Sequence, residues 1–210
     1  LAQVACQCLK LECPKPDLSD WEEMIDAWKH PLHQVSIALV GKYTALHDAY
    51  ISVVEALKHG GVANRTLVNI RWVDSELLNQ DNAAETLAGV SGILVPGDFG
   101  DRGIEGMIVA IQYARENRIP FLGLCLGMQL SIVEFARHVL NFSDAHSVEL
   151  NPATTHPVIN LMPDQEGIED IGGTLRLGSY PCVLDPDSKA CRLYGSTQIT
   201  ERHRHRYEVN

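Results

Sequence analysis

The sequence predicts an α/β protein with a mostly parallel β-sheet and helices on both faces. Apolar β runs alternate with helical patterns over about 100 residues, as expected where strands and helices follow one another in a parallel sheet. The strands are apolar along their whole length, which is typical of strands buried on both faces. Glycine-containing turns follow three of these strands, and open α/β sheets bind ligands at such carboxyl ends.

The elements are predicted from apolar periodicity and from the residues that start and stop helices. Asp48 is expected to cap the first long helix, whose apolar face includes Ile51, Val54 and Leu57, and Gly60-Gly61 is expected to end it. The predicted strands cover residues 34–40, 67–73, 90–95 and 119–124, and further helices cover 81–87, 106–117 and 128–140.

The two ends of the chain differ from this regular middle. Residues 1–33 read as an interdomain linker with one short helix, for which Ser19 is the expected N-cap and Glu22 completes a capping box. Residues 34–210 form the predicted domain. Beyond residue 140 the pattern changes to turns and shorter β runs, expected at 158–161, 173–177 and 181–184.

Composition excludes several classes of protein. The 210 residues carry a net charge of −10, which argues against general binding to nucleic acid or to anionic membranes. No apolar run approaches the roughly 20 residues that span a bilayer, and no signal-peptide pattern opens the chain. The six cysteines lack the spacing of a small secreted domain, so we expect reduced thiols in the cytoplasm. Cys6, Cys8 and Cys13 lack a suitably spaced fourth ligand, so zinc, or any other metal, is not expected.

Cys125 is the strongest candidate for chemistry. It lies between Gly123 and Gly127, at the junction of an apolar strand and a helix. Gly-x-Cys-x-Gly in this context predicts a nucleophile elbow with sulfur in place of the usual hydroxyl. The start of a helix favours thiolate, and the N–H of Leu126 is placed to donate to an oxyanion. The alternative is a buried core cysteine, the commonest state of a free cysteine.

The cysteine turn and several other stretches together resemble the class I glutamine amidotransferases, and more narrowly the glutaminase domain of CTP synthase. The resemblance covers nearly the whole chain and implies a flavodoxin-like fold. The supporting stretches are Leu122-Gly123-Leu124-Cys125-Leu126-Gly127-Met128-Gln129, Val40-Gly41-Lys42-Tyr43, Pro96-Gly97-x-Phe99-Gly100-x-Arg102-Gly103, Asp144-Ala145-His146-Ser147, Gly172-Gly173-Thr174-Leu175-Arg176-Leu177-Gly178 and the terminal Arg202-His203-Arg204-His205-Arg206-Tyr207-Glu208-Val209-Asn210.

This resemblance implies an enzyme of the ligase class that takes part in pyrimidine nucleotide biosynthesis. The glutaminase part would hydrolyse L-glutamine through a thioester on Cys125. Ammonia would pass to a synthetase domain, absent from these 210 residues, which uses ATP and Mg²⁺ to convert UTP to CTP, with GTP as allosteric activator. The resemblance also implies a homotetramer formed through the synthetase domain, and no cofactor in the glutaminase domain itself.

Site residues follow from the resemblance, position by position. Leu126 and Asp98 occupy the oxyanion-hole positions, and Arg206 would pair with the α-carboxylate of glutamine. The other implied glutamine-binding positions are Gly127, Met128, Gln129 and Glu149, and the implied GTP-responsive positions are Phe99, Arg102, Arg176 and Arg204.

From the residues alone, Met128 reads as core and Glu149 as a solvated carboxylate. Strand alternation would put Arg202, Arg204 and Arg206 on one face, with His203 and His205 on the other; the run could also be a basic surface strand.

Two departures from the family pattern bear on activity. Asp98 stands where the family has glycine, adding a Cβ and a carboxylate beside the expected oxyanion, so we expect weakened glutaminase activity. The family's base and its orienting carboxylate belong to a His-Pro-Glu segment beyond the terminal Tyr-Glu-Val-Asn, and His203 and His205 are not substitutes. We therefore expect a piece truncated at both ends that binds glutamine better than it hydrolyses it. Two alternatives stay open: a non-catalytic glutamine-binding relative, and another cysteine hydrolase on the same architecture.

Overall fold

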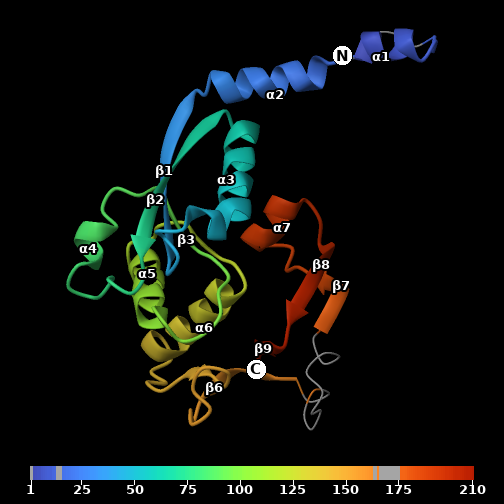
Figure 1. The fold of residues 1–210 in the computed structure, drawn as a ribbon. Helices are drawn as coiled ribbons and strands as arrows, with labels where there is room; N and C mark the ends of the chain where they lie inside the picture. The colour runs from blue at the N-terminus through green and yellow to red at the C-terminus, as the bar shows by residue number, and fades with distance from the viewer. Residues whose placement is uncertain (1, 13–15, 163–164, 166–175) are drawn as a thin grey trace.

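A four-stranded parallel sheet forms the centre of the computed structural model, which describes residues 2–12, 16–162, 165 and 176–210 (Figure 1). Its strand order is β2-β1-β3-β4, and every neighbouring pair is parallel. The strands are β1 (His33–Gly41), β2 (Thr66–Asp74), β3 (Gly92–Val95) and β4 (Phe121–Gly123). The predicted α/β fold is confirmed, and each predicted strand of the sheet is present.

Helices cover both faces of this sheet and bury its apolar strands. Helices α5 (Ile104–Glu116) and α6 (Leu126–His138) pack on one face, where Met107, Leu130 and Val133 are fully buried. On the other face, α3 (Ile51–Ala63) packs against β2, and Leu39, Leu94 and Tyr50 form the buried centre of a smaller cluster. A short helix, α4 (Ala83–Thr86), precedes β3.

An ion pair with a buried carboxylate joins α5 to α6 on the larger side of the core. The Glu134 side chain is 1% exposed, and the Arg115 guanidinium donates to both of its carboxylate oxygens at 2.8–3.1 Å. Two parallel N–H···O bonds of this kind are strong and directional, so they fix the register of the two helices. Helix α6, which begins at the candidate elbow, is thereby tied to the body of the domain.

The predicted caps of two helices are wrong in detail. Helix α2 (Ser19–Lys29) begins at Ser19 itself, because the Asp17 carboxylate accepts hydrogen bonds from the Ser19 N–H at 3.0 Å and its hydroxyl at 2.7 Å. Asp48 lies inside a 3₁₀ turn, η1 (His47–Tyr50), and α3 starts directly after it without a side-chain cap.

Gly60-Gly61 does not end α3, which continues to Ala63. Gly61 is buried there, and a Cβ on it would lie 2.5 Å from the Thr66 carbonyl oxygen, so this glycine lets the helix approach β2. A short N-terminal helix, α1 (Ala2–Cys8), precedes α2, and both project beyond the sheet at the same end of the molecule (Figure 1).

The C-terminal part adds two small sheets. Strand β6 (Pro157–Leu161) lies between β5 (His146–Ser147) and β9 (Tyr207–Val209), while β7 (Arg176–Val183) pairs antiparallel with β8 (Gln198–His205), and α7 (Lys189–Tyr194) connects them. The predicted run at 173–177 lies partly outside the described residues, and the one at 181–184 overlaps the end of β7. Within the described ranges, no helix has the length and apolar character needed to cross a membrane.

Candidate active site

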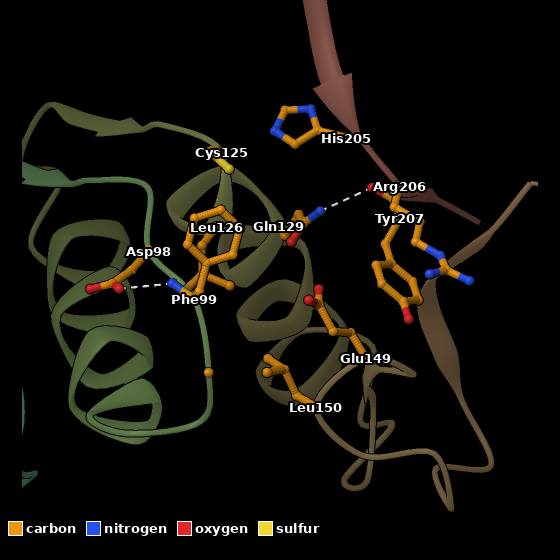
Figure 2. Close-up of a pocket in the computed structure, with 11 residues that line it drawn as sticks. Asp98, Phe99, Cys125, Leu126, Gln129, Glu149, Leu150, His205, Arg206 and Tyr207 are labelled. Carbon is orange, nitrogen blue, oxygen red and sulfur yellow. Dashed lines mark hydrogen bonds between the residues drawn. The ribbon is translucent and has the colours of Figure 1, made fainter. Parts of the chain in front are cut away.

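A cavity of about 370 Å³ opens at the carboxyl end of the parallel sheet, beside the predicted elbow (Figure 2). Its size lies within the usual range for small-molecule pockets. Its walls come from four segments of the chain that are separated in sequence. The lining residues are Asp98, Phe99, Gly100, Cys125, Leu126, Gln129, Glu149, Leu150, His205, Arg206 and Tyr207.

The Cys125 turn has the geometry of a nucleophile elbow. Cys125 has φ 54° and ψ −109°, a strained conformation for a side-chain-bearing residue, and it directly precedes the first residue of α6. The flanking glycines are needed for space: a Cβ on Gly127 would lie 2.1 Å from the Val95 carbonyl oxygen, and one on Gly123 would lie 2.5 Å from the Gly127 backbone. The chain therefore turns tightly enough to present the thiol at the cavity.

The surroundings of the thiol do not lower its pKa. Burial raises the pKa of Cys125 above its ordinary value, and the charges of Glu149 and Asp98 add to the increase. A hydrogen bond from the Leu126 N–H acts in the opposite direction without reversing the shift. Desolvation thus acts against the expected effect of the helix start and is the larger of the two influences on the pKa of Cys125.

Asp98 adopts a different arrangement from the one expected. Its φ is not positive, so the backbone at this position does not require glycine. The carboxylate points away from Cys125, Gln129 and Glu149 (Figure 2) and pairs with Lys42, whose Nζ lies 3.2 Å from Asp98 Oδ1. The side chain adds a negative charge near the thiol, as predicted, but not one directed into the cavity.

The residues predicted to bind glutamine divide into two groups. Gln129, Glu149 and Arg206 line the cavity, and the Glu149 carboxylate extends toward Gln129 (Figure 2). Burial raises the pKa of Glu149, while the positive charge of Arg206 opposes the increase. Gly127 and Met128 lie in the first turn of α6, where their N–H groups donate to the carbonyls of Leu124 and Cys125, and neither lines the cavity.

The terminal run does not follow simple strand alternation. Strand β8 ends at His205, and β9 begins at Tyr207, so Arg206 lies at a bend between them. His205 and Arg206 consequently both line the cavity, although alternation places them on opposite faces, and the Arg206 guanidinium lies beside the Tyr207 ring on the side away from Cys125 (Figure 2). Arg206 Nε is buried with no hydrogen-bond partner among the described residues, and its guanidinium lies 5.9 Å from the centre of the Tyr207 ring.

Two of the predicted GTP-responsive residues lie at the outer edge of the site. The Phe99 side chain is 83% exposed, and Arg102 lies 5.5 Å from the centre of the Tyr43 ring while pairing with Glu76 at 2.7 Å. Arg176 and Arg204 belong to the paired strands β7 and β8, but their side chains lie outside the described structure.

Sequence reasoning gave no role to several residues of the site. Lys42 and Tyr50 contact Asp98, and Tyr207 accepts a hydrogen bond on its carbonyl oxygen from Gln129 Nε2 at 3.0 Å. The position of Lys42 after the glycine that ends β1 was the available signal. His203, His205 and Glu208 bring potential metal-ligand atoms within 4.8 Å of one another, and His203 Nδ1 lies 3.7 Å from Glu208 Oε1.

Comparison with known proteins assigns the family. The profile of the class I glutamine amidotransferases matches residues 45–210. CTP synthases from Carboxydothermus hydrogenoformans and Halalkalibacterium halodurans are 54% and 56% identical to the whole chain, which spans 39% and 40% of their lengths. The glutaminase domain of CTPS from Trypanosoma brucei, with bound acivicin, superimposes with a TM-score of 0.77 at 41% identity, covering 84% of this chain and 68% of that one. The chain therefore belongs to the class I glutamine amidotransferases and, within them, to the glutaminase domains of CTP synthases.

Proposed function

We propose that this chain binds L-glutamine in the cavity beside Cys125 and releases ammonia from it through a thioester. The observation that carries this proposal is the strained Cys125 turn, which presents a thiol at the wall of a pocket that also contains an amide, a carboxylate and a guanidinium. A core cysteine would need neither the strain nor the two closely packed glycines.

The first half-reaction would form the thioester. The sulfur of Cys125, after losing its proton to a base, attacks the side-chain amide carbon of glutamine, and the carbonyl oxygen becomes an oxyanion. The Leu126 N–H already donates a hydrogen bond to the Cys125 side chain. This N–H and the backbone N–H of Asp98 are the proposed donors to the oxyanion. Collapse of the tetrahedral intermediate expels the amide nitrogen, which takes up a proton and leaves as ammonia. Water then cleaves the thioester to glutamate and the free thiol.

The amino-acid end of glutamine is matched by the charges of the opposite wall. Glu149 would accept hydrogen bonds from the α-ammonium group, and Arg206 would pair with the α-carboxylate, a task suited to a guanidinium with a buried unpartnered N–H. Because Gln129 Nε2 donates to the Tyr207 carbonyl, its amide oxygen is the atom left to accept from the ligand. These assignments extend the family resemblance residue by residue.

The larger reaction is a proposal drawn from the relatives. In a CTP synthase the ammonia would be used, with ATP and Mg²⁺, to aminate UTP in a synthetase region, and the product would be CTP. We further propose that Phe99 and Arg102 take part in the response to GTP, since an exposed ring and a cation stacked on Tyr43 suit a purine nucleotide. The base for the first step belongs, in the family, to the His-Pro-Glu segment.

Covalent capture tests the proposal without requiring full turnover. The chain is incubated with an electrophilic glutamine analogue such as acivicin, and its intact mass and peptide map are recorded. We expect one adduct, on Cys125, whose formation is slowed by L-glutamine. Cys125→Ser is the control that should remain unlabelled.

The other free cysteines serve as internal controls for this experiment. Cys8, Cys182 and Cys191 have free thiols in the structure and should be labelled only by small unspecific alkylating agents. Labelling of Cys125 that glutamine does not slow would contradict the proposed pocket. If a chain extended by the His-Pro-Glu segment also remained unlabelled, the non-catalytic glutamine-binding alternative would replace the enzyme.

A further inference from the structure

The Asp98 carboxylate is held by one ion pair and two hydrogen bonds. Lys42 Nζ lies 3.2 Å from Oδ1, the Phe99 N–H donates to Oδ1 at 2.7 Å, and the Tyr50 hydroxyl donates to Oδ2 at 3.3 Å. Lys42 Nζ also donates to the Phe99 carbonyl oxygen. We call Lys42, Tyr50 and Asp98, with the Phe99 backbone, the Asp98 clamp.

Solvent is nearly excluded from the charged pair of this clamp. The Lys42 and Asp98 side chains are 3% and 4% exposed. A charge in such a place is costly unless it is paired and hydrogen-bonded, so removing either partner leaves the other uncompensated. The pair therefore differs from the exposed ion pairs of this protein, such as Glu55 with Lys58, which contribute little.

The loop that carries Asp98 also packs against the Cys125 side chain. A Cβ on Gly97, the neighbour of Asp98, would lie only 3.0 Å from the Cys125 Cβ and 3.6 Å from its sulfur. The loop that follows β3 is thus in van der Waals contact with the reactive side chain. On the other side, Gly41 gives the Tyr50 hydroxyl room, since a Cβ at Gly41 would lie 2.5 Å from that oxygen.

We propose that Lys42 and Tyr50 are positioning residues that hold the Asp98 carboxylate away from Cys125, so that the loop presents its backbone, rather than a negative side chain, to the thiol. The clamp makes an aspartate tolerable at a position where the resemblance implies glycine. The expected effect of the clamp on glutamine hydrolysis rests on the proposed function, whereas its expected effect on the thiol does not. The placement of charge beside the thiol can be tested independently of glutamine.

The test is the pH profile of Cys125 alkylation by iodoacetamide, followed by peptide mapping so that the other cysteines do not interfere. The variants are Lys42→Met, Asp98→Asn, the double variant and Tyr50→Phe. The other titratable or charged groups that line the cavity, Glu149, His205 and Arg206, stay unchanged in all of them.

We expect Lys42→Met to raise the apparent pKa of Cys125 by about half a unit or more, because an unpaired carboxylate then lies beside the forming thiolate. Adding Asp98→Asn should reverse the increase. If Lys42 acted only through its own charge, the double variant would stay raised, and the proposal would be overturned. An unchanged pKa in Lys42→Met would overturn it as well.

A second, more conservative variant keeps the test valid even if Lys42→Met is unstable. Tyr50→Phe removes one donor and retains the ion pair, so we expect a smaller increase in the same direction, again reversed by Asp98→Asn. If Lys42→Met fails to fold, Tyr50→Phe is compared with the double variant Tyr50→Phe, Asp98→Asn. An unchanged Cys125 pKa in Tyr50→Phe would then overturn the proposal.

Failure of the glutaminase proposal would look different. In that case acivicin would not label Cys125 in the unmodified chain, while the alkylation profiles would still report the clamp. In a chain that does label, Lys42→Met should slow acivicin capture by about tenfold, and Lys42→Met with Asp98→Gly should recover most of the rate.

Discussion

The two walls of the cavity are built in different ways. The first, which we call the sheet wall, consists of the loop Pro96–Gly100, the Cys125 turn and the start of α6. The second, the terminal wall, consists of Glu149, Leu150 and the segment His205–Tyr207. Both contribute about equally to the lining, yet only the sheet wall belongs to the four-stranded sheet, while Leu150 and Tyr207 of the terminal wall pack against the core from outside the sheet.

Close backbone contacts fix the sheet wall, whereas the terminal wall is held by apolar packing of Leu150 and Tyr207 on the core together with hydrogen bonds. Gly123, Gly127 and Gly97 leave no space for a methyl group toward their neighbours. The terminal wall is held by the pairing of β6 with β9, by Gln129 Nε2 donating to the Tyr207 carbonyl, and by Asn210 Nδ2 donating to the Pro157 carbonyl. The geometry of the nucleophile is therefore set by close backbone packing, whereas the recognition charges lie on a wall that is held in part by hydrogen bonds.

The largest effect should come from filling the space that the sheet wall requires. In Gly127→Ala the new Cβ would meet the Val95 carbonyl oxygen at 2.1 Å, a contact that forces α6 away from β3. We expect a loss of about 3 kcal/mol or more in the free energy of unfolding, with loss of Cys125 capture. Urea denaturation and acivicin labelling measure the two effects.

A glycine with free space provides the matched control. Gly60 lies in α3, and a Cβ added to it would have nothing within 4 Å, so Gly60→Ala should stabilise by about 0.5–1 kcal/mol and leave labelling unchanged. Equal effects of the two substitutions would show that the sheet wall is not closely packed.

This difference between the walls also explains which parts of the site the sequence predicts. The elbow depends on local information, since two glycines around one cysteine between a strand and a helix determine the turn. The parallel strands are equally local, because each is an apolar run. The predicted core of the sheet, its helices and Cys125 at its edge are all found in the structure.

The parts that were not predicted depend on contacts distant in sequence. The Asp98 clamp joins residues more than forty positions apart, and no pattern within either stretch indicates the pairing. The thiol pKa depends on summed desolvation, which outweighs the helix start. At Arg206, a bend between β8 and β9 breaks the alternation on which the prediction relied.

A middle-sized effect is expected at the hydrogen bond that joins the walls. Gln129→Met removes the donor to the Tyr207 carbonyl and keeps the side chain's length in a buried position. We expect a loss of about 1 kcal/mol in stability, faster amide hydrogen exchange in β9, and weaker protection of Cys125 by glutamine. Hydrogen exchange read by mass spectrometry localises the change.

The control for this substitution lies on the neighbouring helix. Gln112 of α5 makes exposed hydrogen bonds with Gln80 and Glu116, so Gln112→Met should change neither β9 exchange nor glutamine protection. If Gln129→Met left β9 exchange unaltered, the terminal wall would be held by its own sheet, and the comparison would have to be revised.

The smallest effect should come from the loop that carries Glu149. Asp144 accepts hydrogen bonds from the Thr155 N–H at 2.6 Å and its hydroxyl at 2.7 Å, and also pairs with His156, closing the loop between α6 and β6. The bonds from Thr155 first, and then that from His156, hold the pKa of Asp144 well below its ordinary value of 3.8. Its contribution to stability is therefore present above the ordinary pKa and is lost as the pH falls toward the depressed folded value.

Asp144→Asn should lower the melting temperature slightly at neutral pH, and the difference from the unmodified chain should shrink as the pH falls below about 4, where this carboxylate takes up protons in the unfolded chain before it does so in the folded one. Thermal unfolding followed by circular dichroism from neutral to acid pH measures this, with Asp101→Asn in an exposed loop as the control. The Glu149 loop depends on this carboxylate only if the two melting curves converge in acid. Parallel curves would mean that β5 and β6 alone hold the loop, and the terminal wall would then be more rigid than its hydrogen bonds indicate.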